Sequence, residues 1–307
     1  MKLKDHIIAL MLVAVATPAI AQHTPITSQY LFNGLLINPA YSGSRDAFTA
    51  NLTHRQQWVG FQGAPVTQLL SVHSPVKNKS LGLGITVFND RIGVSRETGV
   101  MTSYAYRMRM PRGKISLGLG LGLSSSRSNW QDVSLQQQND ISFATQERRI
   151  IRPNFSTGAY YYSRQNFIGL SIPFLLKQRS VKPSEQASAY TRAVNMQPML
   201  FGGRLMNVNK DLKLKPSMLL RYTPQAGLQG DLSANLILRD VVWIGGSYRS
   251  GDAVVAMIEV LPTPQWRIGY SYDAGISKLA SHHAGSHELM LQYEFGYRIQ
   301  VRDPRYF

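Results

Sequence analysis

The sequence predicts an all-β fold: a transmembrane outer-membrane β-barrel of about 14 antiparallel strands, with a short N-terminal plug-like segment. Three observations predict it. The chain begins with an export signal, its later segments alternate apolar and polar residues, and the links between those segments alternate between long and short. Each of these observations excludes a different alternative.

The N-terminus has the pattern of a secretory signal peptide. Lys2 and Lys4 precede an apolar stretch at 7–16, and small residues lead to Ala21. Ten apolar residues rise only about 15 Å as a helix, half of what a bilayer core needs. We therefore expect export, with cleavage between Ala21 and Gln22.

No apolar run after residue 21 approaches the roughly 20 residues of a membrane-spanning helix, so a helical inner-membrane protein is excluded. The expected organisation is a signal peptide at 1–21, an N-terminal segment or plug at 22–45, a transmembrane β-barrel at 46–299, and a C-terminal periplasmic tail at 300–307.

Apolar and polar residues alternate along most of the remaining chain. In 228–238 the leucines share one face with Ala234, while Gln229, Asp231 and Ser233 share the other. Successive side chains of a strand point to opposite faces, so such segments are strands with one apolar side. We expect strands near 46–56, 65–74, 79–89, 97–110, 113–125, 153–163, 165–172, 197–207, 211–222, 228–239, 241–249, 251–261, 264–273 and 286–299.

Strand length and link length favour a barrel in a membrane over a soluble β-sandwich or solenoid. Segments of about 9 to 12 residues suit a tilted strand that crosses the hydrocarbon layer, whereas soluble strands average about 5 or 6. With both ends in the periplasm, the three longest links, 126–152, 173–196 and 274–285, all face outward. Short periplasmic turns and long outer loops are the pattern of bacterial outer-membrane barrels.

The expected inner faces predict a lumen that is filled. Gly118, Gly120 and Gly122 alternate with leucines on the polar side of their strand and leave room for something packed inside. Mixed charges on these faces indicate paired networks or a plug more than an open anion pore. The residues in question are Arg55, Arg107, Arg109, Arg267, Asp231, Glu288 and Glu294.

A formal net charge of +16 indicates anionic neighbours. An exported chain meets no genome, which argues against nucleic acid and leaves outer-membrane lipid or an acidic protein as the anionic partner. Basic loop residues could meet outer-leaflet phosphates or form a solvated surface: Arg148, Arg149, Lys177, Arg179 and Lys182. Aromatic residues expected at the two membrane interfaces are Tyr160, Tyr161, Tyr162, Trp243, Tyr293, Phe295 and Tyr297.

No pattern predicts catalysis, a metal site or a cofactor, and we expect a protein that is not an enzyme. The chain has no cysteine. His287-Glu288 begins like a zinc-protease helix, but the second histidine is replaced by Leu291. His282 and His283 fall in an expected loop, where polar histidines are common. An outer-membrane esterase would need a Ser and a His at one rim, and only His54 and the serines near 124–128 could supply parts of it.

Three stretches together resemble the PorP/SprF family of type IX secretion system membrane proteins of Bacteroidota. They are Gln29-Tyr30-Leu31-Phe32-Asn33 with Ile37-Asn38-Pro39-Ala40-Tyr41-Ser42-Gly43, then Arg55-Gln56-Gln57-Trp58-Val59-Gly60-Phe61-Gln62-Gly63-Ala64-Pro65, and finally Tyr270-Ser271-Tyr272-Asp273 with Ser277-Lys278-Leu279 and Ser286-His287-Glu288-Leu289-Met290-Leu291. The resemblance runs from about Gln29 to Ile299. It departs at Gly34, where many members are expected to have proline.

The resemblance implies an outer-membrane component that is accessory to secretion or surface attachment of a large adhesin, in some members linked to gliding motility. The implied partners are a secreted protein with a C-terminal sorting domain and the periplasmic and outer-membrane components of the secretion system. A transporter or channel for a small or hydrophobic solute is the alternative function.

The motif residues are candidates for plugging or partner binding. Gln29, Tyr30, Asn38, Pro39 and Ala40 belong to the expected plug, with Arg55 on the first strand. Trp58, Phe61 and Gly63 belong to a turn at the outer rim, where the two rings could contact a partner. Asp273, Ser277, His287 and Glu288 surround the last outward loop, which their hydrogen bonds could pin. The alternative, that these segments simply close and seal the barrel, stays open.

Overall fold

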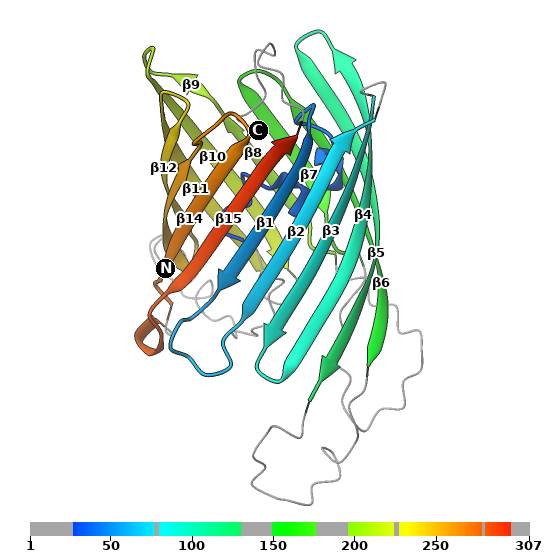
Figure 1. The fold of residues 1–307 in the computed structure, drawn as a ribbon, viewed down its shortest axis with the longest axis vertical. Coiled ribbons are helices and arrows are strands. Elements are labelled where there is room, and N and C mark those ends of the chain that lie inside the picture. Colours follow the sequence, from blue (N-terminus) through cyan, green and yellow to red (C-terminus); the bar gives the residue numbers. More distant parts are fainter. Residues whose placement is uncertain are drawn as a thin grey trace, which may run out of the picture.

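A computed structural model describes residues 27–76, 80–129, 149–175, 196–223, 227–277 and 280–295. Its strands form one closed antiparallel barrel (Figure 1). The expected signal peptide, the C-terminal tail, residues 296–299 of the expected last strand and much of the two longest links lie outside the described residues. No helix among the described residues is long and apolar enough to span a membrane.

Each strand pairs with its neighbours in the chain, and β1 pairs with β15 to close the ring. β8 and β9 are separated by Leu205 and both pair with β10, so together they make one strand of the wall. The described strands therefore form a wall of 14, which confirms the expected fold. They are β1 (Phe48–Gln56), β2 (Val66–Pro75), β3 (Leu81–Ile92), β4 (Ser95–Met110), β5 (Gly113–Ser128), β6 (Ile150–Tyr162), β7 (Asn166–Ile172), β8 (Met199–Arg204), β9 (Met206–Asn207), β10 (Leu212–Thr223), β11 (Gly227–Leu238), β12 (Val242–Arg249), β13 (Ala253–Val260), β14 (Trp266–Gly275) and β15 (Ser286–Phe295).

The barrel is apolar outside and polar inside. Along β14, Ile268, Tyr270 and Tyr272 are exposed on the outer face, while Arg267 and Asp273 are buried on the inner face. A soluble sheet would bury the apolar side instead. Lipid must therefore cover the outer face, and the ring of strands leaves no backbone edge unpaired within it.

The described link between β1 and β2 (57–65), the described part of the link between β14 and β15, and the ends of β5 and β6 that flank the longest link lie at one end of the barrel, at the bottom of Figure 1. We call this end the outer rim, because outer-membrane barrels have longer loops outside and short turns in the periplasm. The other end, with tight turns such as 111–112 between β4 and β5, is the inner rim.

Two sets of expectations for single side chains are wrong. Tyr160, Tyr162 and Trp243 are buried inside the barrel rather than placed at its lipid interface. The alternation of their strands points them inward, and apolar residues of the N-terminal segment cover them there. Arg109 is exposed near the end of β4, at the inner rim, and does not lie within the lumen.

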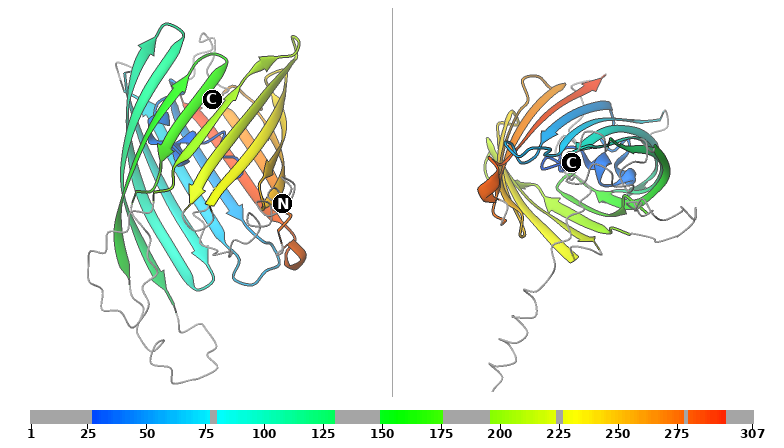
Figure 2. Two further views of the ribbon diagram at one scale, coloured as in Figure 1. Left: turned by 180° about the vertical axis from the view of Figure 1, so that it is seen from behind. Right: turned by 90° about the horizontal axis from the view of Figure 1, so that it is seen from below.

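The N-terminal segment, residues 27–46, lies inside the ring of strands (Figure 2, right). We call it the plug. It contains two single turns of 3-10 helix, η1 (Gly34–Leu36) and η2 (Pro39–Tyr41). The Asn38 side chain caps η2 by accepting a hydrogen bond from Ala40 N, and Pro39 fits the first position of the turn. At Gly34, the departure from the family pattern, any side chain would meet the ring of Tyr41.

Candidate functional site: the plugged lumen

The plug is fixed to the wall near the outer rim by a buried carboxylate. Glu288 accepts hydrogen bonds from the backbone nitrogens of Ser28 and Gln29, at 2.8 and 3.0 Å. Arg55 Nη1 lies 3.0 Å from the same carboxylate, across the β1–β15 pair that closes the ring. Glu288 therefore links the first strand, the last strand and the plug. We call this contact the outer clamp.

The Ser28 side chain extends the outer clamp along the wall. Its hydroxyl donates to the Asp273 carboxylate, at 2.7 Å from Oδ2, and accepts from Arg55 at 3.0 Å and from Arg249 at 3.3 Å. Arg55 Nη2 also pairs with Asp273 at 2.7 Å. Two guanidinium groups and two carboxylates thus surround one serine, which balances the charge of a site with almost no solvent contact.

Tyr30 joins the plug to this network from the next turn of the chain. Its hydroxyl donates to Asp231 Oδ1 at 3.4 Å, and Asp231 in turn pairs with Arg249 at 3.2 Å. Burial and the nearby Asp231 carboxylate raise the pKa of Tyr30 well above its ordinary value. The hydroxyl stays protonated and remains a donor to Asp231.

Midway along the lumen, the ring of Phe32 packs among cationic and aromatic side chains of the wall. Phe32 meets Trp243 edge-on, with ring centres 5.5 Å apart. The Lys215 ammonium and the Arg267 guanidinium each lie 5.4 Å from the Phe32 ring centre, and Arg267 pairs with Glu259 at 2.9 Å. Cation–π contacts of this kind are strongest where water is excluded. The plug therefore fills the lumen and covers wall charges.

Amide and hydroxyl groups hold the plug to two separate parts of the wall. Asn33 Nδ2 donates to Asn51 Oδ1 at 3.1 Å, and Ser71 donates to Asn33 Oδ1 at 2.9 Å. Farther along, Asn38 Nδ2 donates to the backbone oxygen of Ala159 at 3.0 Å. These contacts fix the register of the plug against β1, β2 and β6.

Inner-face glycine lets η2 approach the wall. A Cβ atom at Gly118 would overlap the backbone of Ala40, and Ser116 donates to the Ala40 oxygen at 2.7 Å. The room expected beside the glycines of β5 is thus occupied by the plug at Gly118. At Gly120 and Gly122 a Cβ would instead meet Ser156 and Met101 of the wall.

A second set of ion pairs fixes the plug near the inner rim. Arg45 pairs with Glu294 at 2.7 Å, and both side chains are buried. Asp46 pairs with Arg107 at 3.0 Å and with Lys114 at 2.7 Å. We call this set the inner clamp. The plug is therefore attached at both ends of the lumen, which makes it a built part of the barrel.

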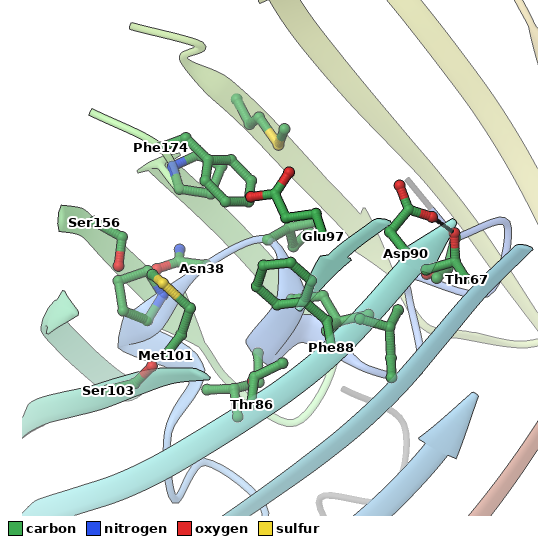
Figure 3. A pocket seen from close by; sticks show the side chains of 18 of the residues that line it. Asn38, Thr67, Thr86, Phe88, Asp90, Glu97, Met101, Ser103, Ser156 and Phe174 are labelled. Atoms are coloured by element: carbon green, nitrogen blue, oxygen red, sulfur yellow. Dashed lines mark hydrogen bonds between the residues drawn. The ribbon is translucent and has the colours of Figure 1, made fainter. Parts of the chain in front are cut away.

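A cavity of about 180 Å³ remains between the plug and the inner faces of β2, β3 and β4 (Figure 3). Plug residues supply one wall, and Phe88 and Met101 face them from the barrel. Asp90 and Glu97 lie toward the outer rim, where Thr67 donates to Asp90 at 2.5 Å. The main lining residues are Leu35, Ile37, Pro39, Leu69, Thr86, Phe88, Met101 and Phe174.

At the outer rim, the turn after β1 is joined to the link before β15. Val59 N donates to the Gly285 oxygen and Ala284 N to the Val59 oxygen, at 2.9 and 2.8 Å. The Trp58 ring lies 6.5 Å from Phe61 and 6.1 Å from His283. Phe61 is 48% exposed, so part of this aromatic cluster faces the surroundings.

The structure brings together residues that lie far apart in the motifs. Gln29, Arg55, Asp273 and Glu288 meet in the outer clamp, and Tyr30 is joined to it through Asp231. Asn38, Pro39 and Ala40 form the capped turn against β5 and β6. These residues hold the plug, whereas the sequence alone suggested that Asp273 and Glu288 pin a loop.

The other candidates lie apart from the outer clamp. Trp58, Phe61 and Gly63 belong to the outer-rim turn, and Gly63 accepts from Gly93 N at 2.8 Å. His287 faces outward, with Nδ1 2.6 Å from the Tyr270 hydroxyl. The backbone oxygen of Ser277 accepts from Ala280 N at 2.9 Å.

Several functional residues of the lumen were not among the candidates predicted from the sequence. Ser28, Phe32 and Arg45 belong to the plug, and Lys215, Arg249 and Glu259 belong to the wall that it meets. Among these, the alternation of β10, β12 and β13 already places the wall residues on inner faces. Which of them meets the plug depends on strand registers that short motifs do not reveal.

The apolar outer face, the closed strand ring and the filled lumen define an outer-membrane β-barrel with an internal plug. The chain belongs to the family of type IX secretion system membrane proteins PorP/SprF, whose family model matches residues 19–293. No curated protein matches the chain.

Solved structures similar to this chain are outer-membrane barrels. A Pseudomonas aeruginosa FadL homologue has a TM-score of 0.49 at 11% identity, with 89% of this chain and 95% of that chain covered. Acinetobacter baumannii outer membrane protein Omp33 has a TM-score of 0.47 at 10% identity, with 83% and 100% covered. The KdgM porin has a TM-score of 0.38 at 13% identity, with 80% and 99% covered. At these identities the likeness does not extend to what those proteins do.

Proposed function

We propose that this barrel is an accessory component of the type IX secretion system that holds or receives a large secreted protein at its outer mouth. Membership of the PorP/SprF family indicates the secretion system in which the barrel acts, and the plugged lumen indicates how it acts. The observation that supports it best is that the plug is held to buried wall carboxylates at both ends, by hydrogen bonds from the Ser28 and Gln29 amides to Glu288 and by the ion pair of Arg45 with Glu294. A barrel filled in this way acts as a receptor more readily than as a channel, and the proposal includes no catalytic step.

The cavity beside the plug is the proposed seat for part of the secreted protein. Its apolar wall suits apolar side chains, and Asp90 and Glu97 near the outer rim suit a basic residue beside them. At about 180 Å³ it accommodates a few side chains and no folded domain. The bulk of the partner would therefore rest on the rim, where Phe61 is exposed.

The partner would be an adhesin-type protein with a C-terminal sorting domain, and the periplasmic side would contact other secretion components. We test this by co-purification of the secreted protein with the barrel from the native outer membrane. Leu36→Trp places an indole ring in the cavity. Leu70→Trp makes the same change on the lipid-facing side of β2.

The proposal predicts that Leu36→Trp reduces co-purification at least fivefold, because the ring occupies the seat. Leu70→Trp should leave it unchanged. Both variants must show the same heat-dependent gel mobility as the wild-type barrel. Equal co-purification with a folded Leu36→Trp barrel would contradict the use of this cavity.

Transport of a hydrophobic solute is the second candidate, favoured by the apolar lining around Phe88 and Ile37. It requires a path past the plug, and therefore release of one clamp. Uptake of a hydrophobic fluorescent solute into liposomes that contain the purified wild-type barrel would support transport. Uptake no faster than in empty liposomes would contradict transport and favour the receptor function.

A further inference from the structure

Arginine side chains line the outward side of adjacent strands near the outer rim. Arg91 of β3 and Arg96 of β4 are partners in the strand register, and Arg96 is also the partner of Arg127 on β5. Arg149 directly precedes β6 and donates to Ser125 on β5 at 2.9 Å. All four side chains are exposed. We call these four residues the arginine row.

The arginine row lies on the lipid-facing side of the barrel. The β4 positions that share a face with Arg96 are Thr98, Val100, Thr102 and Tyr104, while the alternate residues Glu97 and Ser103 line the lumen. The two carboxylates nearest in the sequence, Asp90 and Glu97, are register partners on the inner face. They are therefore on the opposite side of the sheet from the arginine row.

The outward residues change character in layers toward the rim. On β3 an apolar Val87 is followed by Asn89 and then Arg91. On β4 the same steps are Val100, Thr98 and Arg96, and on β5 they are Leu123, Ser125 and Arg127. An apolar layer, an amide or hydroxyl layer and a cationic layer thus follow one another on three adjacent strands.

The spacing of these layers matches a membrane interface. From Met110 to Val100 the ten-residue step along β4 covers about 33 Å of strand, or about 25 Å along the membrane normal at a tilt of about 40°. This is the height of the apolar band of an outer-membrane barrel. Arg96 lies four residues farther, about 10 Å beyond that band at the same tilt.

Like charges placed side by side on neighbouring strands repel each other. Among the described residues, neither Arg91 nor Arg96 forms an ion pair with a carboxylate. Arg96 is positioned by its Nε, which donates to Asn89 Oδ1 at 2.6 Å, and Asn89 donates to Gln68 at 3.3 Å. Such an arrangement is stable when an anion lies between the guanidinium groups.

We propose that the arginine row binds the phosphate groups of an outer-leaflet glycolipid such as lipid A. Guanidinium forks match phosphate oxygens in pairs, and the amide and hydroxyl layer below them suits the hydroxyl groups of the attached sugar. The basic outer surface of this wall would therefore bind lipid. The lumen on the other side of the sheet would bind the proposed protein partner.

The test measures binding of diphosphoryl lipid A to the purified full chain in neutral detergent, by native mass spectrometry. The variant Arg91→Gln/Arg96→Gln removes two charges from the arginine row. The control Arg109→Gln/Arg112→Gln removes two charges at the inner rim, where both arginines are exposed. Heat-dependent gel mobility shows that each barrel is folded.

We expect the first variant to bind at least tenfold more weakly and the control to stay within twofold of wild type. Lipid A without phosphates should bind the wild type as weakly as diphosphoryl lipid A binds the first variant. Unchanged binding by Arg91→Gln/Arg96→Gln, or equal binding of the dephosphorylated lipid, would overturn the proposal. Competition by inorganic pyrophosphate as effective as by the lipid would show a general anion site and also overturn it.

If the double variant does not fold, Arg91→Lys/Arg96→Lys takes its place. It keeps both charges but loses the planar forks, so we expect at least threefold weaker binding of diphosphoryl lipid A. Binding equal to wild type would contradict paired phosphate recognition by these two residues.

Discussion

Arg55 on the first strand and Glu288 on the last strand are register partners across the closure of the barrel, and their side chains lie 3.0 Å apart. The same carboxylate accepts the backbone amides of Ser28 and Gln29. Closing the ring and seating the plug therefore use one side chain. We infer that the two events are coupled when the barrel assembles.

Removing one partner of this pair should destabilise the barrel strongly. Arg55→Met leaves the Glu288 and Asp273 carboxylates buried without their shared guanidinium, and loss of one partner of a buried pair costs about 3–5 kcal/mol. Urea unfolding in lipid vesicles measures the change. The double variant Arg55→Met/Glu288→Leu should lose less than the sum of the losses of the two single variants, and additive losses would contradict the pairing.

An exposed ion pair provides the comparison. Arg239 and Asp211 lie 3.4 Å apart with their side chains 79% and 68% exposed. Asp211→Asn should change the free energy of unfolding by less than about 1 kcal/mol, because solvent screens the pair.

Gly118 should tolerate no side chain. Gly118→Ala places a Cβ against the backbone of Ala40, so η2 must move, and we expect a loss of about 1–3 kcal/mol. Gly246→Ala is the matched control, because its Cβ would lie 3.5 Å from the nearest atom, an ordinary contact. Urea unfolding compares them. A Gly118→Ala barrel as stable as Gly246→Ala would show that the plug does not press on β5.

Replacing Phe32 should test the packing at the centre of the plug. Phe32→Ala empties the space among Lys215, Arg267 and Trp243, and a buried Phe→Ala change costs about 3–5 kcal/mol. Trp243 fluorescence should shift as water reaches its ring, measured in a background where the other three tryptophans are phenylalanine. Phe155→Ala, on the lipid-facing side, should leave that emission unchanged. An unshifted spectrum in Phe32→Ala would argue against the packing described.

The two clamps should keep the lumen closed to ions. In planar bilayers we expect the wild-type barrel to show no steady conductance. Arg45→Ala/Arg55→Ala weakens both clamps and should produce open events as the plug moves. Arg164→Ala/Arg239→Ala, which removes two exposed charges at the inner rim, should remain closed. Steady conductance of the wild type would show a continuous path beside the plug.

Much of the barrel wall could be predicted from the sequence because lipid demands alternation on every strand. The β14 residues show why: each outward residue must be apolar, so Arg267 and Asp273 can only face the lumen. Strand ends were harder to predict. β4 and β5 reach 16 residues each, because their polar outer ends project beyond the apolar band and no longer need to alternate.

The plug could be predicted to exist, but its partners could not. Gly118 indicated room inside the barrel, and the motif around Asn38 indicated a folded segment. The contact of Ser28 with Asp273 joins residues 245 positions apart, and only the strand registers determine it. Trp243 illustrates the same limit, since the alternation of β12 points it inward, but only the strand registers determine that it meets Phe32.

The most direct test of the central claim, that the N-terminal segment fills the lumen, uses a pair of cysteines in this cysteine-free chain. Asn33 of the plug contacts Ser71 on the inner face of β2 at 2.9 Å, whereas Ser74 lies on the opposite face of that strand. Under mild oxidation of native membranes, Asn33→Cys/Ser71→Cys should form a disulfide, detected by mass spectrometry of the digested chain. Asn33→Cys/Ser74→Cys should form none. Absence of the first disulfide, or equal formation of both, would contradict the plugged barrel.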